Sequence, residues 1–194
     1  MSKVQISVYQ KEKPGSPFCG DRYFYEETES GFICALADGL GTGEFAEESA
    51  EIVIDIIKKN PDATPNEIMI TCNKQLHGKR GVVLGILKLD FITNIYTVST
   101  IGNIGIVFIH NKKKQHHIPT GGYLAGTKKK FKVEHGQLKD DMHFIMYSDG
   151  VSDADLNPCI MHEDVREIIS AYDEATKLRE RRDDTTLLAI RYKK

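Results

Sequence analysis

The chain has 194 residues and a net charge of −2, and 40% of its residues are hydrophobic and 28% charged. This balance predicts one domain with a sizeable core and excludes a disordered chain or a basic nucleic-acid-binding protein. No apolar run approaches the roughly 20 residues of a membrane helix, and the N-terminus has a strand pattern, not that of a signal peptide. The four cysteines are widely separated, so we expect a cytoplasmic protein with reduced thiols and no membrane or nucleic-acid partner.

The first part of the chain predicts strands followed by two helices. Residues 4–9 have a strand pattern, and the apolar run GFICALADG at residues 31–39 is typical of a strand buried on both faces. Residues 44–59 repeat apolar side chains every three or four positions, which predicts an amphipathic helix. Residues 64–67, TPNE, form a capping box with proline at the first helical position, so a second helix should begin there.

From Val82 onward the pattern changes to short strands. Six apolar segments follow one another, separated by glycine, asparagine, lysine and aspartate, as is typical of antiparallel hairpins. A helical segment follows at about residues 163–178, and the last strand has the sequence TTLLAIRY. We therefore expect an α+β domain whose strands, close to ten, divide into two packed sheets.

Two lysine clusters interrupt this region. Residues 112–114 lie between expected strands, and residues 128–130 follow a glycine. Both are interpreted as solvated hairpin tips, with a patch for a partner or a phosphate as the less favoured alternative.

The segment ADGLGTG, residues 37–43, joins the buried strand to the first helix and raises the question of a nucleotide-binding loop. Its glycines form GxGxG, but the third glycine of the dinucleotide fingerprint would fall at Glu44. No Gly-Lys-Ser/Thr sequence is present, and the carboxylate of Asp38 would repel a pyrophosphate. The hairpins that follow also lack the βαβ context. These observations argue against nucleotide binding.

Aspartates recur at or near the ends of expected strands. They are Asp21, Asp38, Asp149, Asp183 and Asp184. One Asp-Gly pair is an ordinary turn, but several carboxylates that converge need a cation to offset their repulsion. Oxygen ligands alone select hard ions such as Mg²⁺, Mn²⁺ or Ca²⁺, and the missing EF-hand spacing disfavours Ca²⁺. Gly39 has no side chain, so its backbone carbonyl can approach an ion closely.

The motifs CGD, ADGLGTG, IGN, SDG and DDTT, in this order, resemble those of the metal-dependent type 2C Ser/Thr protein phosphatases. The resemblance covers nearly the whole chain and is to the compact bacterial branch of sporulation and stress regulators. It implies a single domain over residues 1–194, folded as a four-layer α-β-β-α sandwich of two antiparallel sheets flanked by helices. It also implies two Mn²⁺ or Mg²⁺ ions at one end of the sandwich.

The same resemblance implies a role for each ligand. Asp38 would bridge both ions, and Asp149 and Asp183 would complete the ligands of one ion. Asp21 and the carbonyl of Gly39 would hold the other.

Because Asp183 and Asp184 are adjacent, Asp184 stays open as the alternative ligand. Asp38 and Asp149 would act in catalysis through a metal-bound water, which attacks a phosphoserine or phosphothreonine as hydroxide. No phosphoenzyme forms in such a reaction, so no nucleophilic cysteine is required.

Some parts of the family pattern are not found in this sequence. Larger eukaryotic members use an arginine to hold the phosphate and a histidine as general acid, and neither can be assigned. Arg22 is interpreted as structural, as are His77, His116 and His117. Asn103 is interpreted as part of a hairpin turn, although the family places it near the site.

The resemblance also implies partners. The expected substrates are phosphorylated STAS-domain proteins of the stressosome, whose dephosphorylation would provide negative feedback on the sigma-B stress response, and the expected state is a monomer. The alternative is a non-catalytic module of the same fold that binds a phosphoprotein without hydrolysing it. Such a module should have lost metal ligands, and all of the aspartates are retained.

Overall fold

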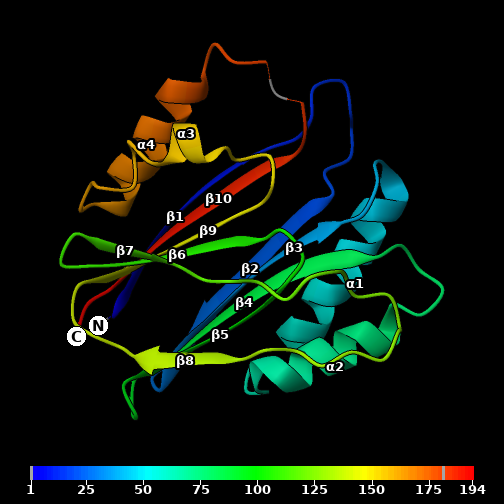
Figure 1. Ribbon diagram of the computed structural model, residues 1–194, viewed down its shortest axis with the longest axis horizontal. Helices are drawn as coiled ribbons and strands as arrows, with labels where there is room; N and C mark the ends of the chain where they lie inside the picture. The colour runs from blue at the N-terminus through cyan, green and yellow to red at the C-terminus, as the bar shows by residue number, and fades with distance from the viewer. Residues whose placement is uncertain (1, 181) are drawn as a thin grey trace.

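The computed structural model describes residues 2–180 and 182–194, which form ten strands and four helices (Figure 1). In chain order the strands are β1 (Val4–Lys11), β2 (Asp21–Glu27), β3 (Gly31–Gly39), β4 (Val82–Asp90), β5 (Ile95–Ile101), β6 (Gly105–His110), β7 (Lys113–His116), β8 (Glu134–Gln137), β9 (Met142–Tyr147) and β10 (Thr185–Tyr192). The helices are α1 (Glu44–Lys59), α2 (Pro65–Gln75), α3 (Asp153–Leu156) and α4 (Val165–Thr176).

The strands form two five-stranded sheets, and every pairing between named strands is antiparallel. The first sheet has the order β1-β10-β9-β6-β7, and the second has the order β2-β3-β4-β5-β8. Figure 1 shows the sheets stacked face to face, with α3 and α4 outside the first and α1 and α2 outside the second. The expected four-layer α-β-β-α sandwich is therefore confirmed.

Three apolar clusters hold the layers together, one at each interface between layers. At the centre of the cluster between the sheets, the rings of Tyr96, Phe108 and Phe144 pack with centroids 5.1–5.8 Å apart. The outer two clusters bury the apolar stripes of α1 with α2 and of α3 with α4. β3, β4, β9 and β10 contribute to two clusters each, and almost all of their residues are buried.

Local sequence signals fix several boundaries. Helix α1 occupies the predicted residues, and α2 begins at the predicted capping box, in which the Oγ1 of Thr64 accepts from the N–H of Glu67. Lys112 lies in the β6–β7 turn with a φ of 61°, as predicted for a hairpin tip, whereas Lys113 and Lys114 already belong to β7. The prediction for residues 128–130 is wrong: they lie in an irregular segment beside α2, where Asn73 holds Thr127.

The strand register brings the expected site residues to one end of the sandwich. Lys11 at the end of β1 lies opposite Thr185 at the start of β10, and Tyr147 at the end of β9 pairs with Leu187. Asp21 pairs with Asp38 in the other sheet. Figure 1 shows the chain termini together at the far end. Within the described residues, no helix combines the length and apolar character needed to cross a membrane.

We expect Phe144→Ala to lower the free energy of unfolding by about 3–5 kcal/mol, because it removes a fully buried ring between the sheets. The control is Ile92→Ala, at a side chain that is 77% exposed, which should change stability by less than about 0.5 kcal/mol. Urea denaturation of both variants measures the difference. Equal losses would contradict an inter-sheet core centred on Phe144.

Candidate metal centre

Two aspartates face each other across neighbouring strands of the second sheet. Asp21 is the first residue of β2, and Asp38 lies near the end of β3 directly opposite it. Asp21 is 1% exposed, and Asp38 is partly buried. Two carboxylates are therefore held side by side by backbone pairing at the edge of the core.

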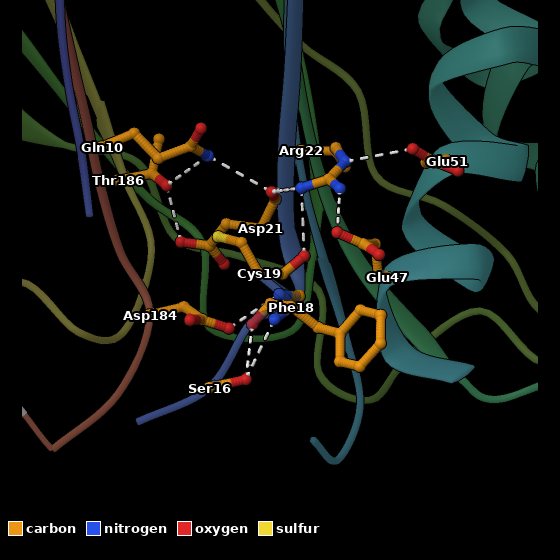
Figure 2. A network of polar contacts seen from close by, with 11 residues as sticks. Gln10, Ser16, Phe18, Cys19, Asp21, Arg22, Glu47, Glu51, Asp184 and Thr186 are labelled. Atoms are coloured by element: carbon orange, nitrogen blue, oxygen red, sulfur yellow. Dashed lines mark hydrogen bonds and ion pairs between the residues drawn. The ribbon is translucent and has the colours of Figure 1, made fainter. Parts of the chain in front are cut away.

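The buried carboxylate of Asp21 is held by side chains from the other sheet (Figure 2). Its Oδ2 accepts hydrogen bonds from the Oγ of Ser148 at 2.6 Å and from the Oγ1 of Thr186 at 2.7 Å. Gln10 donates both to Thr186 and to the carbonyl of Asp21. Burial raises the pKa of Asp21 to about 6, and the two hydroxyl groups partly oppose that rise.

Asp38 is the most perturbed of these acids. Its pKa is raised to about 8, first by burial and then by the charges of Asp21, Asp149, Asp183 and Asp184, in that order. Desolvation also raises the pKa of Asp149, followed by repulsion from Asp183. The structure thus brings all five predicted aspartates close enough to act on one another electrostatically.

The adjacent residues Asp183 and Asp184 differ in their contacts. Asp184 accepts the N–H of Lys13 at 2.8 Å and that of Gly20 at 2.7 Å, one with each oxygen. It thereby anchors the loop that leads into β2 (Figure 2). Asp183 is exposed, and its Oδ1 accepts the N–H of Asp184 at 3.0 Å. Asp183 therefore has the freer carboxylate for a ligand.

The glycine-rich loop after Asp38 allows helix α1 to approach closely. A Cβ on Gly39 would lie 2.0 Å from the carbonyl oxygen of Ala46 in α1, so only glycine fits there. Gly41 and Gly43 have φ values of 97° and 81°, which favour glycine. The loop is a tight strand-to-helix connection, and this packing requirement is separate from the metal-binding reason suggested by the sequence.

Arg22 has the structural surroundings that we expected. It forms ion pairs with Glu47 and Glu51 of α1 and donates to the carbonyls of Cys19 and Asp21 (Figure 2). These contacts tie β2 to α1.

Two of the histidines, His116 and His117, line a hollow that Asn103 and Asp149 also line. His117 is buried, and its Nδ1 lies 2.5 Å from an oxygen of Glu134. His116 is exposed at the end of β7, and His77 is exposed after α2.

Sequence reasoning missed the polar residues that hold the acids in place. Asn103 donates to the Oδ2 of Asp149 at 2.7 Å. The hairpin turn expected here is wrong, because β5 and β6 belong to different sheets and Asn103 lies in the connection between them. Ser148 and Thr186 act on Asp21 as described. The sequence signal that could have found Ser148 and Thr186 is their closeness to the predicted aspartates. Ser148 immediately precedes Asp149, and Thr186 lies two residues after Asp184.

The donor set suits hard divalent cations. In the parts of the chain that the structure describes, no three His, Cys, Asp or Glu side chains already surround a point at metal-ligand spacing. The five aspartates nevertheless offer only oxygen donors, and their mutual repulsion is the kind that a cation offsets. The residues therefore fit Mg²⁺ or Mn²⁺ better than Zn²⁺, which prefers nitrogen and sulfur ligands.

The fold and this group of acids define a class of enzyme. Residues 28–193 match the family model described as Stage II sporulation protein E (SpoIIE). The match spans most of the chain, so the protein belongs to the SpoIIE family of PP2C-type phosphatases. The resemblance to type 2C phosphatases inferred from the motifs is thereby confirmed.

Within this class the motifs VYQ, ICALADGLGTG and GGYLAG also resemble those of the phosphatase RsbX. The chain is 30% identical over 188 residues to phosphoserine phosphatase RsbX of Bacillus subtilis (strain 168), covering 95% of this chain and 93% of that protein. A crystal structure of RsbX in complex with magnesium superposes with a TM-score of 0.91 at 29% identity, over 97% of this chain and 95% of that one.

A third comparison is with a structure described as the bacterial stressosome, a modular system that has been adapted to control secondary messenger signaling. It superposes with a TM-score of 0.87 at 23% identity, over 98% of this chain and 100% of that one. At this identity the likeness shows the fold alone.

We expect Asp38→Asn to stabilise the metal-free protein, because it removes the most strongly repelled carboxylate. A raised folded-state pKa means that stability present at low pH is lost as pH rises toward about 8. In EDTA at pH 8 the free energy of unfolding of the variant should exceed that of the parent by roughly 1–3 kcal/mol, since one pKa unit corresponds to about 1.4 kcal/mol. Thermal denaturation between pH 5 and pH 8 measures this.

With Mn²⁺ the parent should become more stable than Asp38→Asn, because an ion that binds the native state stabilises it, and more so the higher its affinity. The parent should gain melting temperature with Mn²⁺, and Asp38→Asn should gain little. An equal gain in both proteins would exclude Asp38 as a ligand.

Proposed function

We propose that the protein is a Mn²⁺- or Mg²⁺-dependent phosphoserine/phosphothreonine protein phosphatase. The observation that carries the proposal is the convergence of five carboxylates at one end of the sandwich, each charged group opposing ionisation of Asp38. Keeping such a group together without a cation is costly. The family membership and the magnesium complex of the relative RsbX support the same reading.

We propose two ions, with Asp38 as the shared ligand. Asp149 and Asp183 complete the ligands of one ion, and Asp21 and the carbonyl of Gly39 hold the other. Asp183 is favoured over Asp184 because only its Oδ1 accepts a backbone N–H among the described contacts, whereas both oxygens of Asp184 do so.

When bound, such ions would lower the pKa of a coordinated water, so that hydroxide is available near neutral pH, and would offset negative charge on the phosphoryl group. The side chains of the protein position the carboxylates that would bind the ions. Ser148 and Thr186 fix one oxygen of Asp21, and Asn103 fixes one oxygen of Asp149. These two carboxylates are thus oriented before a substrate arrives, which is the arrangement expected where ligands must be held for a metal. Cysteine chemistry is not needed.

For the substrate we propose phosphorylated STAS-domain proteins of the stressosome, of the RsbS and RsbR types. The support is the likeness to RsbX over nearly the whole chain. Their dephosphorylation in the cytoplasm would act as negative feedback on the sigma-B stress response. We further propose that residues 1–194 act as one catalytic domain and as a monomer.

Phosphate release from a phosphorylated STAS-domain protein should require Mn²⁺ or Mg²⁺ and stop in EDTA. Asp149→Asn should lower kcat by at least about 100-fold, because it removes a ligand charge. The matched control is Asp62→Asn, the same substitution at an exposed aspartate outside the group of acids, which should retain activity. Release in EDTA would refute the metal mechanism. Tight binding without release under any metal would favour the non-catalytic module.

Asn103→Ala should weaken Mn²⁺ affinity by about 10–100-fold, the range typical for loss of a group that orients a ligand. The measurement is the Mn²⁺ concentration at half-maximal activity, together with the melting temperature. A variant with lower stability but unchanged Mn²⁺ dependence would restrict Asn103 to a structural role in the connection from β5 to β6.

A further inference from the structure

A group of positively charged side chains lies beside the loop that follows Asp38. It is formed by the end of α2, the turn that leads to β4, and the irregular segment after Gly126. We define the cationic face by its members, Lys74, Arg80, Lys128, Lys129 and Lys130. Four of them are exposed and Lys129 is partly buried.

The lysine segment is held against α2 by one buried side chain. Asn73, 8% exposed, donates from Nδ2 to the carbonyl of Thr127 at 2.7 Å. Its Oδ1 accepts the N–H groups of Ala125 and Gly126 at 3.0 and 3.1 Å. Gly126 has a φ of 83°, and a Cβ there would meet His77 at 2.9 Å. The lysines therefore have a fixed base rather than the freedom of a solvated hairpin tip.

A hollow of about 500 Å³ lies within the face. Lys74, Lys128 and Lys129 line it, together with two apolar side chains, Ile70 and Phe131. Ile70 is 51% exposed although it lies in a helix. A hollow lined by both apolar and cationic side chains is suited to a protein surface that carries acidic groups beside a small apolar contact.

Direct contacts join the cationic face to the glycine-rich loop after Asp38. The N–H of Leu40 donates to the carbonyl of Gly81 at 2.8 Å, which extends the β3–β4 pairing past Gly39. The Arg80 guanidinium lies 3.7 Å from where a Cβ of Gly41 would stand. Lys129 donates to the carbonyl of Tyr123 at 2.9 Å. Arg80 therefore links the face to the loop that directly follows Asp38.

The charges of the face are available to a partner. Lys79 next to the face pairs with Glu48 at 2.7 Å. Among the described residues, by contrast, no carboxylate lies within ion-pair distance of Lys74, Arg80 or Lys128. In a chain with a net charge of −2, this is a local concentration of positive charge beside a strongly acidic site.

We propose that the cationic face docks an acidic surface of the phosphoprotein substrate next to its phosphorylated residue. This inference rests on the proposed phosphatase function and adds where the substrate protein is recognised. A positive face beside the metal centre steers an acidic phosphoprotein surface into place. Complementarity of charge gives selectivity, because proteins without acid groups at that position lose the contact.

The test is a double charge reversal, Lys74→Glu with Lys128→Glu, assayed in Mn²⁺ on two substrates. On a phosphorylated STAS-domain protein at low salt, KM should rise about 10-fold or more, since like charges then face each other. On 4-nitrophenyl phosphate, which has no protein surface, kcat and KM should be unchanged. Added salt should raise KM of the parent and narrow the gap between the proteins.

The matched control is Lys113→Glu with Lys139→Glu, two exposed lysines away from the face, which makes the same change in net charge. It should leave both substrates unaffected. An unchanged KM for the phosphoprotein in the Lys74/Lys128 variant, or an equal rise in the control, would overturn the docking proposal. Failure of the parent to hydrolyse either substrate would instead refute the phosphatase function, so the two failures are distinguishable.

Discussion

The hydrogen-bonded carboxylate of Asp21 is the contact on which the arrangement of the site depends. It belongs to the second sheet, yet its Oδ2 is held by Ser148 and Thr186 of the first, in a region without access to water. A buried charge of this kind persists only when its partners are correctly placed. The contact therefore fixes how the two sheets meet at their acidic end, and Asp149 follows directly after one of the partners.

Different parts of the molecule provide its stability and its group of acids. The three apolar clusters extend over the length of the sandwich and hold the layers, whereas the acidic end is destabilising in the absence of cations. Such opposition is common at functional sites, where groups are kept in arrangements that are unfavourable by themselves. Antiparallel strands suit this role because their pairing fixes Asp21 opposite Asp38 without help from either side chain.

Residues of the same type have different roles in this protein because the fold gives them different contacts. Asp184 uses both oxygens on backbone N–H groups and anchors the loop before β2, whereas Asp183 is exposed beside it. Arg22 is occupied by Glu47 and carbonyl groups, whereas Arg80 has no carboxylate within ion-pair distance in the described part of the chain. Residue type alone does not distinguish these pairs, since the difference lies in which partners the fold brings within reach.

The sequence by itself determined the two helices that begin at Glu44 and Pro65, the hairpins, and the aspartates at strand ends, because periodicity, capping and turn residues act over a few positions. The order of its motifs also indicated the family. Only the tertiary structure decided that Ser148, Thr186 and Asn103 hold the acids. It also placed the second lysine cluster beside α2, where Asn73 holds Thr127 and Gly126. These contacts join residues that are tens of positions or more apart, and no local pattern encodes them.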